Sequence, residues 1–175
     1  QNQFAIKKNY GEFFVRGSKI SLKKDANLKK QKELIFDIFI AIGKSKKINA
    51  IETSSMSLLK NNLNLIDTNF RNDQKHASKF LEILKSQYNL SSILKSVKSI
   101  GVIQKYIPEL DEVIGQMQFD LFHVYTVDEH TFKVVRNMRQ MHIHYVEEFK
   151  LEYELINKLP KIEILYLAGL FHDLG

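Results

Sequence analysis

Three residues in the second half of the chain have the side chains of a metal site. His130 stands alone, and His172 and Asp173 form a doublet near the end of the sequence. Imidazole nitrogens combined with a carboxylate suit Mn²⁺, Fe or Zn²⁺ and, less well, Mg²⁺. A divalent ion held in this way would lower the pKa of a bound water molecule and could support hydrolysis of a phosphate ester. A single histidine on an apolar helix face is more often a hydrogen-bonded core residue, so the expectation depends on the combination.

The sequence before His130 has a pattern typical of the start of a helix. Residues 126–129, Thr-Val-Asp-Glu, have the pattern of a capping box, in which the threonine hydroxyl accepts a backbone N–H and the glutamate reaches back. This pattern predicts a helix from there to about residue 141. His130, Val134 and Met138 are spaced four residues apart and would share its inward face.

The doublet would lie at the end of a second helix. Pro160 suits the first turn of a helix over residues 161–174, which is apolar nearly all round and is therefore expected to be central. His172 and Asp173 would project about 100° apart around its axis, so both side chains could lean into one groove. A buried carboxylate without a partner would cost several kcal/mol, so we expect a cation near it.

The other histidines are weaker candidates. His123 precedes the predicted helix and could orient a ligand or touch a leaving group, but a structural role is equally open. His142 and His144 are expected in a solvated loop between two helices. His76 has no companions in the sequence that suggest a site.

The upstream chain supplies the remaining elements. Gly11 and Gly17 separate short alternating runs within residues 3–22, which predicts a small β meander. The apolar period then becomes helical, with lysines on the opposite faces. Pro108 interrupts that pattern, because the residue before a proline avoids the helical region. The predicted fold is mainly α, with a β meander over residues 1–25, a helical connecting segment over 26–107 and a helical bundle over 108–175.

Composition limits the class of protein. The 175 residues are 44% hydrophobic and include no cysteine, so neither a disulfide framework nor a thiolate metal site is possible. That composition fits a reducing compartment, and we expect a cytoplasmic protein. There is no run of 18 apolar residues and no apolar signal segment at the N-terminus, so we expect no membrane association.

Charge is distributed unevenly along the chain. Residues 1–105 carry 20 Lys and Arg against 8 Asp and Glu, whereas residues 106–175 carry 6 against 12. The basic part could steer an anionic or acidic partner, although solvated helix faces explain scattered lysines more simply. We find no motif typical of nucleic-acid binding, no nucleophile elbow and no glycine-rich phosphate loop, so nucleic acid is not an expected partner.

Longer strings of residues resemble a known family, the bifunctional uridylyltransferase/uridylyl-removing enzymes that act on the nitrogen-regulatory protein PII. The resemblance covers most of the chain, is strong from Gly101 onward and is weakest over residues 1–50. The string from Gln116 to His130 is far more specific than a bare His-Asp doublet. The similar strings are residues 65–67, 70–73, 80–84, 106–109, 115–130, 159–160 and 165–173.

The resemblance implies a phosphohydrolase domain of the HD superfamily, with His130, His172 and Asp173 as ligands of Mn²⁺ or Mg²⁺ and His123 as a catalytic candidate. The implied reaction is hydrolysis of the uridylyl–tyrosine phosphodiester of PII, with release of UMP. In this family a nucleotidyltransferase domain precedes the segment and glutamine-sensing domains follow it. We expect both to lie outside this chain. We also expect the HD domain to be incomplete at residue 175, without its last aspartate ligand, so the segment alone is expected to be inactive.

Two other functions remain open at this point. One is a different HD-superfamily hydrolase that acts on guanosine polyphosphates or cyclic nucleotides. The other is a helical regulatory or scaffolding domain whose doublet no longer binds a metal. Substrate competition would separate the first from the PII assignment, and metal binding would test the second.

Overall fold

The computed structural model describes residues 8–114, 126–145 and 147–173, and the chain divides into two compact units, residues 1–106 and 107–175. The prediction of a mainly α fold with a small N-terminal sheet is confirmed. Among the described residues, no helix has the length and apolar character needed to cross a membrane.

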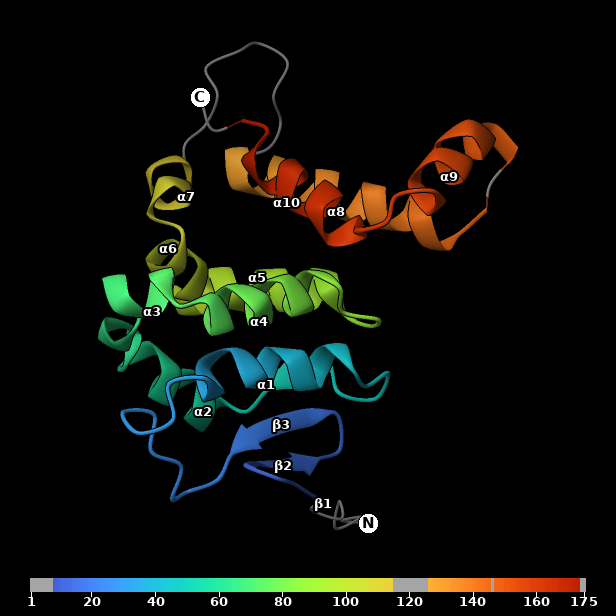
Figure 1. Ribbon diagram of the computed structural model, residues 1–175. Coiled ribbons are helices and arrows are strands. Elements are labelled where there is room, and N and C mark those ends of the chain that lie inside the picture. Colours follow the sequence, from blue (N-terminus) through green and yellow to red (C-terminus); the bar gives the residue numbers. More distant parts are fainter. Residues whose placement is uncertain (1–7, 115–125, 146, 174–175) are drawn as a thin grey trace. The chain divides into compact units, whose positions relative to one another are not determined.

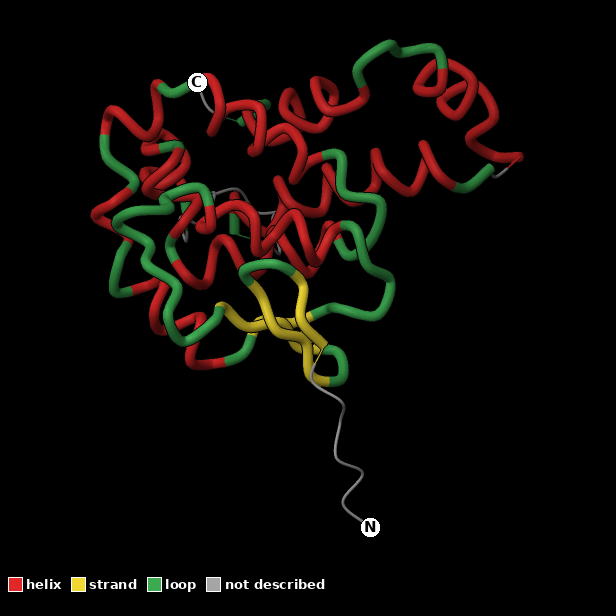
Figure 2. Tube along the Cα trace, turned by 60° about the horizontal axis from the view of Figure 1, so that its bottom comes forward, coloured by secondary structure: helices red, strands yellow, loops and turns green. Residues whose placement is uncertain are grey.

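The sheet of unit 1 begins as a meander of three antiparallel strands, β1 (Lys8–Tyr10), β2 (Phe13–Arg16) and β3 (Lys19–Leu22). Two-residue loops join them, and each begins with a glycine at positive φ, Gly11 at 57° and Gly17 at 59°. Glycine adopts this conformation without strain, which is why the sequence pattern located both turns. A fourth strand that the sequence did not reveal, β4 (Ala50–Ile51), pairs in parallel with β3 (Figure 2).

Helices make up the rest of unit 1. The helix α1 (Leu34–Gly43) is its centre, because it contacts β3 on one side and the helices α4 and α5 on another (Figure 1). Its sequence is almost entirely apolar, which is typical of a helix covered on several sides. The other elements are α2 (Thr53–Lys60), the 3₁₀ turn η1 (Leu63–Leu65), α3 (Thr68–Asn72), α4 (Gln74–Leu84), α5 (Leu90–Ile100) and α6 (Val102–Tyr106).

Gly43, the last residue of α1, lies where another part of the chain comes close. A Cβ atom at this position would lie 2.2 Å from Ser86 Oγ and 2.6 Å from Ser86 Cβ. The Gly43 carbonyl also accepts a hydrogen bond from the Tyr88 N–H at 2.9 Å. The glycine therefore allows the chain that leaves α4 to approach α1 closely.

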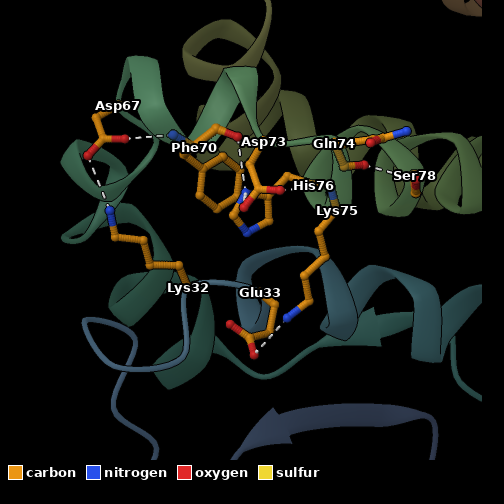
Figure 3. Close-up of polar contacts among 9 residues, drawn as sticks. All are labelled: Lys32, Glu33, Asp67, Phe70, Asp73, Gln74, Lys75, His76 and Ser78. Carbon is orange, nitrogen blue, oxygen red and sulfur yellow. Dashed lines mark hydrogen bonds and ion pairs between the residues drawn. The ribbon is translucent and has the colours of Figure 1, made fainter.

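Two aspartates start the helices α3 and α4 (Figure 3). Asp67 accepts the Phe70 N–H at 2.8 Å, and Asp73 accepts the Lys75 N–H at 2.8 Å, as the sequence predicted for Asp73. Such caps satisfy N–H groups that have no partner within the helix. The Phe70 N–H also lowers the pKa of the Asp67 carboxyl.

His76 is buried beside these caps rather than isolated. Its Nδ1 lies 3.0 Å from the Phe70 carbonyl oxygen, and its ring stacks on the Phe70 ring with centroids 3.6 Å apart (Figure 3). Phe36 of α1 packs edge-on against Phe70 and against Tyr106, at centroid distances of 5.3 and 4.9 Å. This aromatic cluster joins α1, α3, α4 and α6.

Unit 2 is built on a pair of helices, α8 (Val127–Ile143) and α10 (Ile162–Phe171), which contact each other along much of their length. They run antiparallel, because the start of α10 lies near the end of α8 and its end lies near the start of α8. The buried apolar side chains of this pair include Val135, Tyr166 and Leu170, and the polar Thr131 and Glu163 are buried as well. The other elements of unit 2 are α7 (Pro108–Val113), the 3₁₀ turn η2 (Glu147–Phe149) and α9 (Lys150–Asn157).

Two expectations for this helix pair are wrong. Thr126 is the N-cap residue of α8, but its hydroxyl accepts no capping hydrogen bond, so the predicted capping box is not formed. The helix α10 ends at Phe171 and buries one face, whereas Ile164 on another face is 53% exposed. An apolar sequence shows that a helix can be buried on all sides. Whether it is buried depends on the elements that pack against it.

Candidate metal centre

The helix pair of unit 2 brings His130, His172 and Asp173 together. His130 lies in the first turn of α8, His172 caps the C-terminal end of α10, and Asp173 follows it. The two histidine Nε2 atoms are 3.3 Å apart. Asp173 Oδ2 lies 3.2 Å from His172 Nε2 and 3.7 Å from His130 Nε2. Among the described residues this is the only group of three or more His, Asp or Glu side chains with such a spacing.

A backbone hydrogen bond orients His172. Its Nδ1 lies 2.9 Å from the carbonyl oxygen of Gly169, one helical turn earlier. A carbonyl can only accept, so Nδ1 carries the proton, and the neutral ring directs its Nε2 lone pair at the other two residues. The same arrangement, a ring N–H held by a carbonyl, is usual for metal-binding histidines.

The Asp173 carboxylate lacks an ordinary partner. Its Oδ2 atom is buried and accepts no hydrogen bond among the described residues. In the neutral ring the neighbouring His172 Nε2 cannot supply one, because with the proton on Nδ1 that nitrogen carries a lone pair. A buried carboxylate oxygen facing a nitrogen lone pair is unfavourable unless a cation lies between them.

The donor set and its spacing fit a divalent ion. Two donor atoms about 2.1 Å from one ion, at angles of about 90–110°, are separated by about 3.0–3.4 Å. The three separations in the cluster, 3.2, 3.3 and 3.7 Å, are close to that range. Two imidazoles and a carboxylate suit Mn²⁺, Fe or Zn²⁺ and can also hold Mg²⁺. The side chains are 26–38% exposed, so water or a substrate oxygen can reach the group.

Not every candidate residue joins the cluster. His123 lies outside the described residues. His144 is exposed and lines a cavity of 390 Å³ together with Asn137, Gln140, Met141 and Phe149, none of which belongs to the cluster. The sequence reasoning also missed Gly169, although an isolated glycine inside an apolar helix is a signal of close packing.

His142 does not lie in a solvated loop, as expected from the sequence, but in the last turn of α8. Its Nδ1 is 3.1 Å from the hydroxyl of Tyr166 in α10, and Arg139 hydrogen-bonds the same hydroxyl. The arginine donates to the hydroxyl oxygen, so the Tyr166 O–H can donate to a neutral His142. Burial, and then the positive charge of Arg139, lower the pKa of His142 below its ordinary value of 6.5.

This shift predicts a pH dependence of stability. The folded state favours neutral His142, so just below pH 6.5 it binds fewer protons than the unfolded chain. The contribution of His142 to stability is therefore present above that pH and is lost as the pH falls through its lowered pKa. Thermal unfolding followed from about pH 7.5 to about pH 5.5 should show a smaller decrease for His142→Gln than for the unchanged chain.

His144→Gln is the matched control, because His144 is exposed in the same segment. That variant should keep the pH dependence of the unchanged chain. Identical pH profiles for His142→Gln and the unchanged chain would show that His142 does not contribute to it.

Comparisons with known proteins identify one family, both by a family model and by individual relatives. Residues 13–106 match the family described as uridylyltransferase GlnD third domain. The chain is 35% identical over 164 residues to the bifunctional uridylyltransferase/uridylyl-removing enzyme of Pseudomonas fluorescens (strain SBW25), which covers 93% of this chain and 18% of that protein. It is 37% identical over 142 residues to the enzyme of the same name from Azotobacter vinelandii, which covers 81% of this chain and 16% of that protein.

The chain thus spans less than a fifth of the length of these relatives. No solved structure matches it.

Proposed function

This chain belongs to the family of bifunctional uridylyltransferase/uridylyl-removing enzymes, and on that premise we propose that its second unit carries part of the hydrolytic, uridylyl-removing site. The reaction proposed is metal-dependent hydrolysis of the uridylyl–tyrosine phosphodiester on the regulatory protein PII, which releases UMP. The observation that supports it is the convergence of His130, His172 and Asp173. A buried carboxylate oxygen of Asp173 has no hydrogen-bond partner within the described part of the chain.

In this proposal the three residues hold Mn²⁺ or Mg²⁺. A bound divalent ion lowers the pKa of a water molecule and withdraws charge from a phosphorus centre. The chain's own contribution is to orient the ligands: the Gly169 carbonyl fixes the His172 ring, and the helix pair places His130 opposite it. His123 is proposed to act at the tyrosyl oxygen that leaves.

Uridylylated PII is proposed as the partner because the chain belongs to this family. Uridylylated PII would present its modified tyrosine to unit 2 in the cytoplasm, and glutamine would be sensed by other parts of the full-length protein. The excess of Lys and Arg in residues 1–105 would favour an acidic surface of the partner. Part of that charge is already engaged, since Lys32, Lys44, Lys75 and Lys79 pair with carboxylates of unit 1.

The test uses the full-length protein with uridylylated PII as substrate and release of UMP as the measured quantity. His130→Ala should reduce the rate of UMP release in Mn²⁺ by more than about 100-fold, because loss of a metal ligand exceeds the effect of losing its supporting contacts. His144→Ala is the matched control, since it removes an exposed histidine beyond the end of the same helix. Uridylyl transfer to PII by the same variants reports whether the rest of the protein is intact.

Full UMP release by His130→Ala would overturn the proposal. If the protein hydrolyses guanosine polyphosphates or cyclic nucleotides in preference to uridylylated PII, the proposed substrate is wrong and the proposed metal centre stands. Absence of both metal binding and hydrolysis in the unchanged full-length protein would favour the scaffolding function.

A further inference from the structure

Gly169 lies on the face of α10 that packs against Val135 and Met138 of α8. It is buried, and a Cβ atom built on it would lie 3.0 Å from Met138 Sδ, 3.3 Å from Met138 Cε and 3.4 Å from Val135 Cγ2. The two Met138 contacts would be tighter than ordinary non-bonded contacts, whereas the Val135 contact would be an ordinary one. Its φ is not positive, so the backbone conformation does not require glycine. What Gly169 provides is space for the Met138 side chain.

The same residue makes direct contact with the cluster through its backbone. Its carbonyl oxygen accepts the Nδ1–H of His172, the residue one turn later on α10. Movement of α10 away from α8 at Gly169 would therefore change the helix separation, and the His172 ring would move together with its carbonyl acceptor.

The geometry of the cluster is sensitive to that separation. His130 belongs to α8, whereas His172 and Asp173 follow α10, so every distance between the two sides depends on how closely the helices approach. A metal site requires ligand distances within about 0.2 Å of their ideal values. Relief of the 3.0 Å contact to an ordinary one requires a displacement of a few tenths of an ångström, either of the Met138 side chain or of α10 relative to α8.

We propose that Gly169 is a positioning residue of the His130–His172–Asp173 cluster, because its missing side chain admits Met138 and its carbonyl orients His172. The effect of Gly169 on the positions of the three side chains can be measured in the metal-free protein. The effect on metal affinity rests on the function proposed above.

The test begins with the metal-free 175-residue chain, labelled with ¹⁵N at histidine. In the unchanged chain the ring protons of His130 and His172 should show a nuclear Overhauser effect, because the ring centroids are 5.3 Å apart. The His172 nitrogens should report the tautomer with the proton on Nδ1. Gly169→Ala should weaken the ring-to-ring effect, although alanine favours a helix more than glycine does. The His172 tautomer should be unchanged, because alanine keeps the backbone carbonyl.

A second-site change separates positioning from general destabilisation. Met138→Ala removes the sulfur and methyl atoms that the new Cβ would meet, so Gly169→Ala combined with Met138→Ala should regain the ring-to-ring signal. Ala168→Val is the control, because Ala168 is exposed on the same helix and its enlargement should leave both signals unchanged.

Mn²⁺ titrations of the same variants give the second measurement. Gly169→Ala should weaken Mn²⁺ binding about 10-fold, and the double variant should recover most of that loss. An unchanged ring-to-ring signal in Gly169→Ala would overturn the inference, as would a lower unfolding temperature that Met138→Ala does not relieve. If the unchanged chain shows the expected histidine signals but neither it nor the full-length protein binds Mn²⁺, the proposed function fails and the positioning role stands.

Discussion

Asp173→Ala is expected to weaken Mn²⁺ binding at the cluster by more than about 100-fold. The variant removes the only carboxylate among the three residues and leaves two neutral imidazoles, which attract a divalent cation far less strongly. Isothermal titration calorimetry on the 175-residue chain and on the full-length protein measures the effect. Both are needed, because a site with three ligands from two helices binds metal weakly on its own.

Glu152→Ala is the matched control for this prediction. Glu152 is an exposed carboxylate on α9 of the same unit, and its removal changes the net charge by the same amount as Asp173→Ala. Mn²⁺ binding should be unchanged in this variant. Equal affinities for Asp173→Ala and the unchanged protein would mean that Asp173 is not a ligand of the bound Mn²⁺.

Phe36→Ala should lower the free energy of unfolding of unit 1 by about 3–5 kcal/mol. The Phe36 side chain is 1% exposed and lies at the centre of the aromatic cluster, edge-on to both Phe70 and Tyr106. Its removal leaves a cavity between α1 and the helices α3 and α6, and the rigid rings around the cavity cannot collapse into it. Urea unfolding followed by circular dichroism measures the change.

Phe14→Ala provides the comparison within the same unit. Phe14 is half-buried, on the face of β2 opposite to Phe13 and Val15, so its truncation should cost less than about 1.5 kcal/mol. Similar decreases in the free energy of unfolding for the two variants would show that the cluster around Phe36 does not contribute more to the stability of unit 1 than a half-buried side chain does.

Local features of the fold could be predicted because neighbouring residues determine them. Gly11 and Gly17 located two turns, since only glycine adopts their positive φ freely, and Asp73 located the start of α4 through a hydrogen bond within its own first turn. The change from a two-residue to a helical apolar period after β3 indicated a mainly α chain. The short helix α3 was missed because its five residues carry too little periodicity, although Asp67 caps it.

Features that depend on distant residues were not predictable in the same way. The strand β4 exists because residues 50–51 reach the edge of β3, and two residues carry no pattern of their own. His142 and Tyr166 meet only because α8 and α10 run antiparallel. The exposure of Ile164 likewise depends on which neighbours α10 has, and an apolar sequence does not identify them.

The candidate metal centre combines both kinds of information. The sequence by itself determined the residue types, an imidazole in one helix and an imidazole–carboxylate doublet at the end of another, and these define the chemistry of the donor set. Only the tertiary structure decided that their donor atoms lie 3.2–3.7 Å apart, with the His172 ring held by Gly169. Distances between two helices depend on the side chains packed between them, here Met138 against a glycine, and no pattern within either helix specifies that contact.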